Sequence, residues 1–241
     1  MARRQAALVR IAGIPIYIDA SWLLIFAFVS WTLATGYFPG RLPGASALAY
    51  GLMGFVSALL LFVCVLSHEL GHSLLAKASG IPVARVVLFV FGGVAHIGSS
   101  PRRPLTELKI AIAGPLVSLG IAALCLWLSA VWVPQTYGQQ IAWAILRYVA
   151  TVNIALIIFN LLPGLPLDGG RILRAILWAL TKDPRKATRI SATVGQGLGI
   201  ALIVMGAFWL VRGDWINGMW YGFLGMFLRQ AACASLAEAS S

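Results

Sequence analysis

Residues 110–146 contain no Lys, Arg, Asp or Glu, and this run of 37 residues restricts the fold more than any other feature. A helix needs about 20 apolar residues to cross a bilayer. The run is therefore too long for one crossing, and Pro134 with the polar stretch 135–140 predicts a break within it. A second charge-free run, residues 42–68, precedes it. Both runs indicate membrane-spanning helices.

The composition supports this interpretation. Charged residues make up 10% of the chain and apolar residues 60%, whereas soluble domains contain about 25% charged residues. A water-soluble domain of 241 residues could not cover its surface with so few charges. We therefore expect an α-helical polytopic membrane protein with about six transmembrane helices and exclude most soluble enzymes. The expected spans are about residues 18–36, 47–79, 104–133, 140–167, 190–211 and 215–237.

The basic residues predict the orientation of these spans. Fifteen of the eighteen Lys and Arg residues fall on the side that holds the N-terminus, and the other three are Arg41, Arg147 and Arg212. Because cytoplasmic loops retain Lys and Arg, both termini are expected to be cytoplasmic, in a multi-pass protein of the plasma or inner membrane. The basic residues behind the net charge of +11 then orient the chain in the membrane and interact with anionic lipid headgroups. The charge is therefore explained without nucleic acid, and we expect no nucleic-acid partner. We also expect the first span to be retained, not cleaved as a signal peptide.

Two segments do not have the pattern of simple helices. Residues 83–91 are β-branched and aromatic and are bounded by Pro82 and by Gly92 and Gly93, which predicts a strand, and residues 94–97 are a possible return strand. Residues 163–170 (PGLPLDGG) have the composition of a turn at the end of an apolar span. Irregular backbone at membrane depth survives only when it is buried in protein or lines a wet cavity. A small membrane-associated β element and a cavity near the cytoplasmic side are therefore expected.

The second hydrophobic stretch ends in the pattern H-E-x-x-H, formed by His68, Glu69 and His72. On a helix, positions i and i+4 lie on one face, so both imidazoles can reach one zinc ion. Glu69 follows His68 directly and is placed to take a proton from an attacking water. We therefore predict one Zn²⁺ per chain, with Glu69 as the catalytic base.

A tetrahedral zinc ion held by two histidines needs a third protein ligand. Asp19 and Glu107 are expected at helix starts. His96 is expected on the possible return strand, where an interfacial or hydrogen-bonded role is favoured over binding zinc. Asp168 differs, because prolines and glycines interrupt the apolar span around it. It is the favoured third ligand, and it can also cap a helix predicted over Gly169–Leu180.

Together, these motifs resemble those of the site-2 protease family of intramembrane zinc metalloproteases. The first family motif is matched by His68-Glu69-Leu70-Gly71-His72. The second, N-x-x-P-x-x-P-x-D-G, is matched by Asn160, Pro163, Pro166, Asp168 and Gly169. Further similar segments are Leu88–Ala95, Ala113-Gly114-Pro115 and Gly13-Ile14-Pro15-Ile16. The resemblance covers about residues 10–230.

The resemblance implies that His68, His72 and Asp168 bind zinc, that Glu69 is the base, and that Asn160 hydrogen-bonds substrate or the developing oxyanion. The implied function is intramembrane proteolysis of transmembrane protein substrates. The implied substrate-pairing strand consists of Val86, Val87, Leu88, Phe89, Val90 and Phe91. Residues 1–241 are then a single transmembrane peptidase domain, in which the spans at 47–79, 104–133 and 140–167 form the core. Some members continue into CBS or PDZ domains, and we expect neither in this six-span core.

Two positions depart from the family pattern. Ser118 stands where relatives often have Asn, and Asp19 stands where they often have His. Neither departure is expected to touch the catalytic set.

Two other functions are compatible with histidines and carboxylates in membrane spans. A metal transporter usually needs polar groups along a path across the membrane, whereas the ionisable residues here gather toward the cytoplasmic half. A catalytically inactive scaffold that binds membrane helices would not need the intact base and ligands. The sequence therefore favours the protease.

Overall fold

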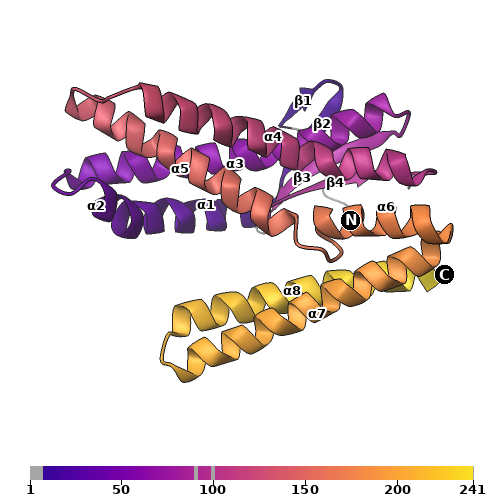
Figure 1. Cartoon of the computed structure of the whole chain (residues 1–241). Helices are drawn as coiled ribbons and strands as arrows, with labels where there is room; N and C mark the ends of the chain where they lie inside the picture. The colour runs from indigo at the N-terminus through magenta and orange to yellow at the C-terminus, as the bar shows by residue number, and fades with distance from the viewer. Residues whose placement is uncertain (1–7, 90–91, 99–100, 241) are drawn as a thin grey trace. The chain divides into compact units, whose positions relative to one another are not determined.

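The computed structural model describes residues 8–89, 92–98 and 101–240. It consists mostly of helices with one small sheet (Figure 1). Two compact units are distinguished, one made of residues 1–100 and 113–157 and the other of residues 101–112 and 158–241.

In the first unit, the first apolar span covers Ser21–Arg41. It consists of α1 (Ser21–Thr32), the π-helical turn η1 (Leu33–Tyr37) and α2 (Phe38–Arg41). The cap residue of α1 is Ala20, and the backbone nitrogen of Ser21 donates to Asp19 Oδ1 at 2.9 Å, so Asp19 lies at the helix start as expected. Hydrogen bonds from Ser21 hold the pKa of Asp19 below its usual range.

Three long helices provide the other spans of this unit. They are α3 (Ala47–Ala78), α4 (Pro104–Val131) and α5 (Tyr137–Asn160), of which α4 and α5 each cross between the units. Buried side chains of the first unit form a core that includes Phe38, Met53, Cys64 and Tyr148. The break predicted near Pro134 is confirmed, because residues 132–136 separate α4 from α5.

The sheet has four strands in the order β1-β2-β3-β4. Its strands are β1 (Val9–Ile11), β2 (Ile14–Ile18), β3 (Val83–Phe89) and β4 (Gly92–Ile97). The outer pairs are antiparallel hairpins, and β2 pairs with β3 in parallel. The predicted hairpin is present, whereas the two N-terminal strands were not predicted. They are short, and their apolar residues are continuous in sequence with the first span.

The sheet order determines which strand edges are open to an added strand. Val86, Val87 and Leu88 pair with β2 on one side and with β4 on the other, so their backbone edges are already occupied. Phe89 also pairs with Gly92 of β4, while Val90 and Phe91 lie outside the described residues. Strand addition needs an unpaired edge. Among the described residues, β4 pairs only with β3, so the outer edge next to the predicted strand belongs to β4.

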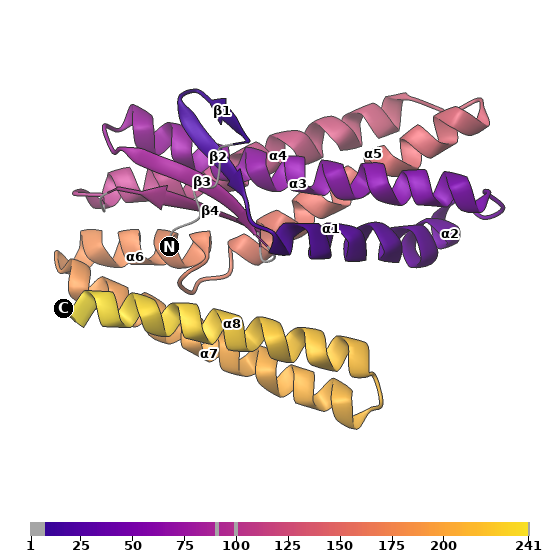
Figure 2. The same cartoon turned by 180° about the vertical axis from the view of Figure 1, so that it is seen from behind.

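The second unit contains the start of α4, then α6 (Asp168–Thr181), α7 (Pro184–Val211) and α8 (Trp215–Ser240). Helices α7 and α8 lie side by side in both views (Figures 1 and 2). Glycines permit this close approach, because a Cβ at Gly206 would lie 2.6 Å from the backbone nitrogen of Gly222. The sixth predicted span is one helix that continues past Arg229.

A buried ion pair joins α4 to α6 within the second unit. Arg174 Nε donates to Glu107 Oε1 at 2.6 Å, and the Glu107 side chain is fully buried. Glu107 occupies the first turn of α4, as the sequence predicted, but its partner on α6 was not predicted. The pair fixes the start of α4 against the helix that begins with Asp168.

The membrane character of the chain is confirmed. Among the described residues, five helical segments are long and apolar enough to cross a membrane: Ser21–Arg41, α3, α4, α5 and α7. The sixth expected span, which is α8, is not one of them. Large apolar side chains are exposed on these segments, with Leu24 76% and Val211 88% accessible. Such exposure is unfavourable in water and typical of surfaces that meet lipid. The chain is a multi-pass helical membrane protein with a small sheet.

Candidate metal centre

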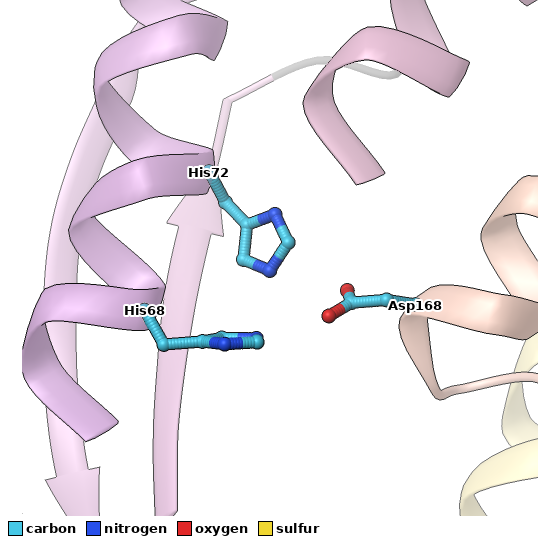
Figure 3. A group of neighbouring side chains, drawn as sticks. All are labelled: His68, His72 and Asp168. Atoms are coloured by element: carbon cyan, nitrogen blue, oxygen red, sulfur yellow. The ribbon is translucent and has the colours of Figure 1, made fainter. Parts of the chain in front are cut away.

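Helix α3 presents two histidines on one face. His68 and His72 are 97% and 96% buried, and their ring centroids lie 4.9 Å apart. Figure 3 shows both imidazoles projecting from the same side of the helix. This arrangement follows from the four-residue spacing, since 3.6 residues complete one turn. The pair predicted from the sequence is therefore formed.

Ser118 of α4 contacts the first of these histidines. Its Oγ lies 3.0 Å from His68 Nδ1, and both side chains are buried. When Nδ1 carries the proton, the hydroxyl accepts it in a hydrogen bond and Nε2 keeps its lone pair for a metal. The expectation that Ser118 does not touch the catalytic set is therefore wrong. Sequence spacing could not reveal the contact, because the two residues are fifty positions apart on different helices.

Gly114 leaves space in front of both metal-facing nitrogens. A Cβ at this position would lie 2.2 Å from His72 Nε2 and 2.6 Å from His68 Nε2. The two Nε2 atoms therefore converge on a space that any side chain at residue 114 would fill. Buried imidazole nitrogens that share such a space have the geometry and chemistry of a zinc site. Gly114 is part of the Ala113-Gly114-Pro115 segment noted in the sequence.

Glu69 lies against the sheet. A Cβ at Gly93 of β4 would be 2.5 Å from Glu69 Cγ, so glycine is needed where the strand passes this side chain. The carboxylate of the predicted base is half-buried, next to the strand that has the open edge. This placement puts an acid–base group beside a backbone surface suited to an extended peptide.

Asp168 is the first residue of α6 in the second unit and is 93% buried. The residue at the helix cap is Leu167, and Asp168 is the acidic residue of the first turn of α6. The preceding loop is held tightly, because Leu165 N donates to Ser191 O at 3.1 Å and a Cβ at Gly170 would meet the backbone of Gly164 at 2.1 Å. The glycines and prolines of this stretch thus fix the start of α6.

His68 and His72 of the first unit and Asp168 of the second are described residues that could each offer one ligand atom to a metal ion. All three are buried. Asn160 is the last residue of α5 and is half-buried. The side chain of His96 lies outside the described residues, whereas its backbone belongs to β4.

Known proteins share this combination of motifs. The family model of peptidase family M50 matches residues 56–143 and 131–204, which include both metal motifs. The chain belongs to peptidase family M50. The resemblance noted in the sequence is thereby confirmed.

Individual members of the M50 family align over most of this chain. A Synechocystis protein provisionally named as a zinc metalloprotease is 40% identical over 94% of the chain and 58% of its own length. The Mycobacterium tuberculosis protein Rip3, also provisionally named as a zinc metalloprotease, is 38% identical over 92% of the chain and 56% of its own length. The chain thus spans little more than half the length of these relatives.

A solved structure of the same type is also similar. The site-2 protease from Methanocaldococcus jannaschii superposes with a TM-score of 0.66 at 31% identity, covering 96% of this chain and 95% of that one. The similarity therefore covers nearly the whole chain, beyond the motifs.

Proposed function

We propose that this protein is an intramembrane zinc endopeptidase that hydrolyses peptide bonds within or near transmembrane segments of other membrane proteins. The observation that carries the proposal is the buried His68–His72 pair on a membrane-spanning helix, with Glu69 between them and Gly114 leaving space at both Nε2 atoms. Membership of peptidase family M50 supports the same reaction.

Glu69 moves the proton in this reaction. Zinc, when bound, supplies Lewis-acid activation of water and of the scissile carbonyl. The Glu69 carboxylate accepts a proton from the attacking water and then donates it to the leaving amine. Asn160 hydrogen-bonds the substrate or the oxygen on which negative charge develops, as a side-chain amide can. Ser118 Oγ, 3.0 Å from His68 Nδ1, can accept the Nδ1 proton in a hydrogen bond and so leave Nε2 available to zinc.

The substrate strand in this proposal is β4 in place of β3. A peptide bond in a helix is shielded, so the substrate must be extended before water can attack. An extended segment can add to the outer edge of β4 through main-chain hydrogen bonds. Glu69 packs against Gly93 of the same strand, which brings the base to the edge where the peptide would bind.

The reaction is tested with a purified transmembrane reporter in detergent or proteoliposomes. We expect cleavage within or near the reporter helix, loss of cleavage with a zinc chelator, and recovery when zinc is returned. Zinc flux into sealed proteoliposomes without cleavage would instead indicate a transporter. The proposed location is the plasma or inner membrane with both termini cytoplasmic, which accessibility labelling of single cysteines at residues 5 and 135 would test.

Asp168 is proposed as the third zinc ligand. Loss of a residue that only hydrogen-bonds a ligand lowers zinc affinity by up to about 100-fold. Loss of the ligand itself in Asp168→Ala should therefore lower the affinity by at least about 100-fold. Zinc affinity is measured by competition with a chelator of known strength. Asp183→Asn is the matched control, because Asp183 is an exposed carboxylate that caps α7 in the same unit. Unchanged zinc affinity in Asp168→Ala would reject this ligand, and His96→Ala would be measured next.

Ser118→Ala should weaken zinc binding by about 10- to 100-fold, because the hydrogen bond that orients His68 is lost. Ser118→Thr keeps a hydroxyl and should recover most of the affinity. Ser57→Ala is the control, as it removes an equally buried hydroxyl from α3. Equal zinc affinity in wild type and Ser118→Ala would show that this contact does not position the ligand.

A further inference from the structure

A cavity of about 380 Å³ lies in the first unit, at the opposite end of α3 from the histidines. It is formed where α2 ends, α4 ends and α5 begins. Its lining is mostly apolar and includes Trp132 and Trp143, together with Arg41, Ser129 and Gln140. Tryptophan is enriched where helices pass from lipid into water. The cavity therefore has the composition of a membrane–water boundary.

Two arginines adjoin this cavity. Arg41 lines it, with its guanidinium 5.3 Å from the centre of the Tyr37 ring. Arg147 lies 5.4 Å from the centre of the Trp143 ring and donates to Ser129 Oγ at 3.5 Å, and both of these partners line the cavity. They are two of only three basic residues that fall outside the predicted cytoplasmic side. Arg41 thus lines the cavity, and Arg147 contacts two of the residues that line it.

Among the described residues, no acidic side chain pairs with either arginine. Residues 20–68 and 108–167 contain no Asp or Glu, so α1, α2, the first two-thirds of α3, most of α4 and all of α5 offer no counter-charge. Arg147 is ten residues into α5, which is about 15 Å along the helix axis, and its side chain is exposed. A charged group at that depth is costly without an anionic partner.

We propose that this cavity binds an anionic glycerophospholipid, with the headgroup phosphate between Arg41 and Arg147 and acyl chains along the exposed apolar sides of α4 and α5. Guanidinium groups match phosphate oxygens with paired hydrogen bonds. Basic pockets between transmembrane helices recognise lipid headgroups in this way. The tryptophans pack against the glycerol and upper acyl region, and Gln140 adds a neutral hydrogen-bonding side chain. The bound lipid would stabilise the loop between α4 and α5.

The test is a lipid titration of the delipidated full chain in detergent, followed by native mass spectrometry. The probe is phosphatidylglycerol. We expect one tightly bound molecule in the wild type and at least about tenfold weaker binding in the double variant Arg41→Gln, Arg147→Gln. Arg212→Gln is the matched control, because Arg212 is the third basic residue on the predicted non-cytoplasmic side, lies over the Phe208 ring of α7 and is not among the residues that line the cavity. Its binding should stay within about twofold of wild type.

Two competitors separate a membrane lipid from other ligands. Diacylglycerol has the same acyl chains without phosphate, and glycerol 3-phosphate has the phosphate without chains. We expect both to bind at least about tenfold more weakly than phosphatidylglycerol. Equal binding of either competitor, or an equal loss in Arg212→Gln, would overturn the proposal. Circular dichroism checks the fold of each variant. If the glutamine variants do not fold, the double variant Arg41→Lys, Arg147→Lys is used instead. Lysine keeps the positive charge but cannot form the paired hydrogen bonds of a guanidinium group, so we expect an affinity between those of the wild type and the glutamine variant.

Discussion

Replacing Gly114 with alanine is expected to abolish zinc binding while leaving the helices intact. The added methyl would lie 2.2 Å from His72 Nε2 and 2.6 Å from His68 Nε2, which is closer than van der Waals contact permits. It would occupy the space on which both ligand nitrogens converge. The neighbouring backbone cannot move away easily, because Gly114 lies inside the long helix α4. We expect at least about a 100-fold loss of zinc affinity, measured by chelator competition.

Gly120→Ala is the matched control for this experiment. Gly120 lies on the same helix, and a Cβ at that position would meet no atom within 4 Å. Alanine is the better helix former, so this variant should bind zinc normally and keep its helix content. Wild-type zinc affinity in Gly114→Ala would contradict the geometry and show that the metal is held elsewhere. A loss in both variants would instead indicate general damage to α4.

Glu69→Gln is expected to retain zinc and to lose cleavage by about 100- to 10,000-fold, the usual contribution of general acid–base catalysis. Glutamine has nearly the same shape as glutamate but cannot accept the proton of the attacking water. The reporter cleavage rate and the zinc content are measured on the same preparation. The two readouts together separate loss of the base from loss of the metal.

His68→Ala provides the contrasting pattern. This variant should lose both zinc and cleavage, because the imidazole belongs to the candidate metal-binding group. Full cleavage by Glu69→Gln would remove Glu69 from the role of base. Loss of zinc in Glu69→Gln would show that the carboxylate holds the metal site together, directly or through its packing against Gly93.

The helices were predictable because their causes are local. Length and uninterrupted apolar character decide whether a segment can cross a bilayer, and both can be counted along the chain. The expected spans at 47–79 and 104–133 agree closely with α3 (Ala47–Ala78) and α4 (Pro104–Val131). The helix expected over Gly169–Leu180 is α6 (Asp168–Thr181). The N-terminal strands escaped prediction, because a short apolar strand next to an apolar span has no period of its own.

Part of the site was also predictable, for a similar reason. His68 and His72 are separated by about one helical turn, so their common face follows from helix geometry alone. The pairing of Ser118 with His68 and of Glu107 with Arg174 depends on contacts between different helices. No local pattern distinguishes a buried serine that orients a ligand from one that only fills space. The roles of Asp168 in zinc binding and of Asn160 in substrate binding remain predictions.

The sequence by itself determined the membrane class, the positions of the spans and the metal-binding motif, because hydropathy and helical spacing act over short stretches of chain. Tertiary structure alone decided which strand edge is open. The edge of β3 that does not face β4 pairs with β2, which lies some seventy residues earlier in the chain. It also decided that Gly114 leaves room at the two imidazoles, and that Arg147 contacts residues of the cavity that Arg41 lines. These features arise from packing between elements distant in sequence, and the distances between their atoms are set only when the chain has folded.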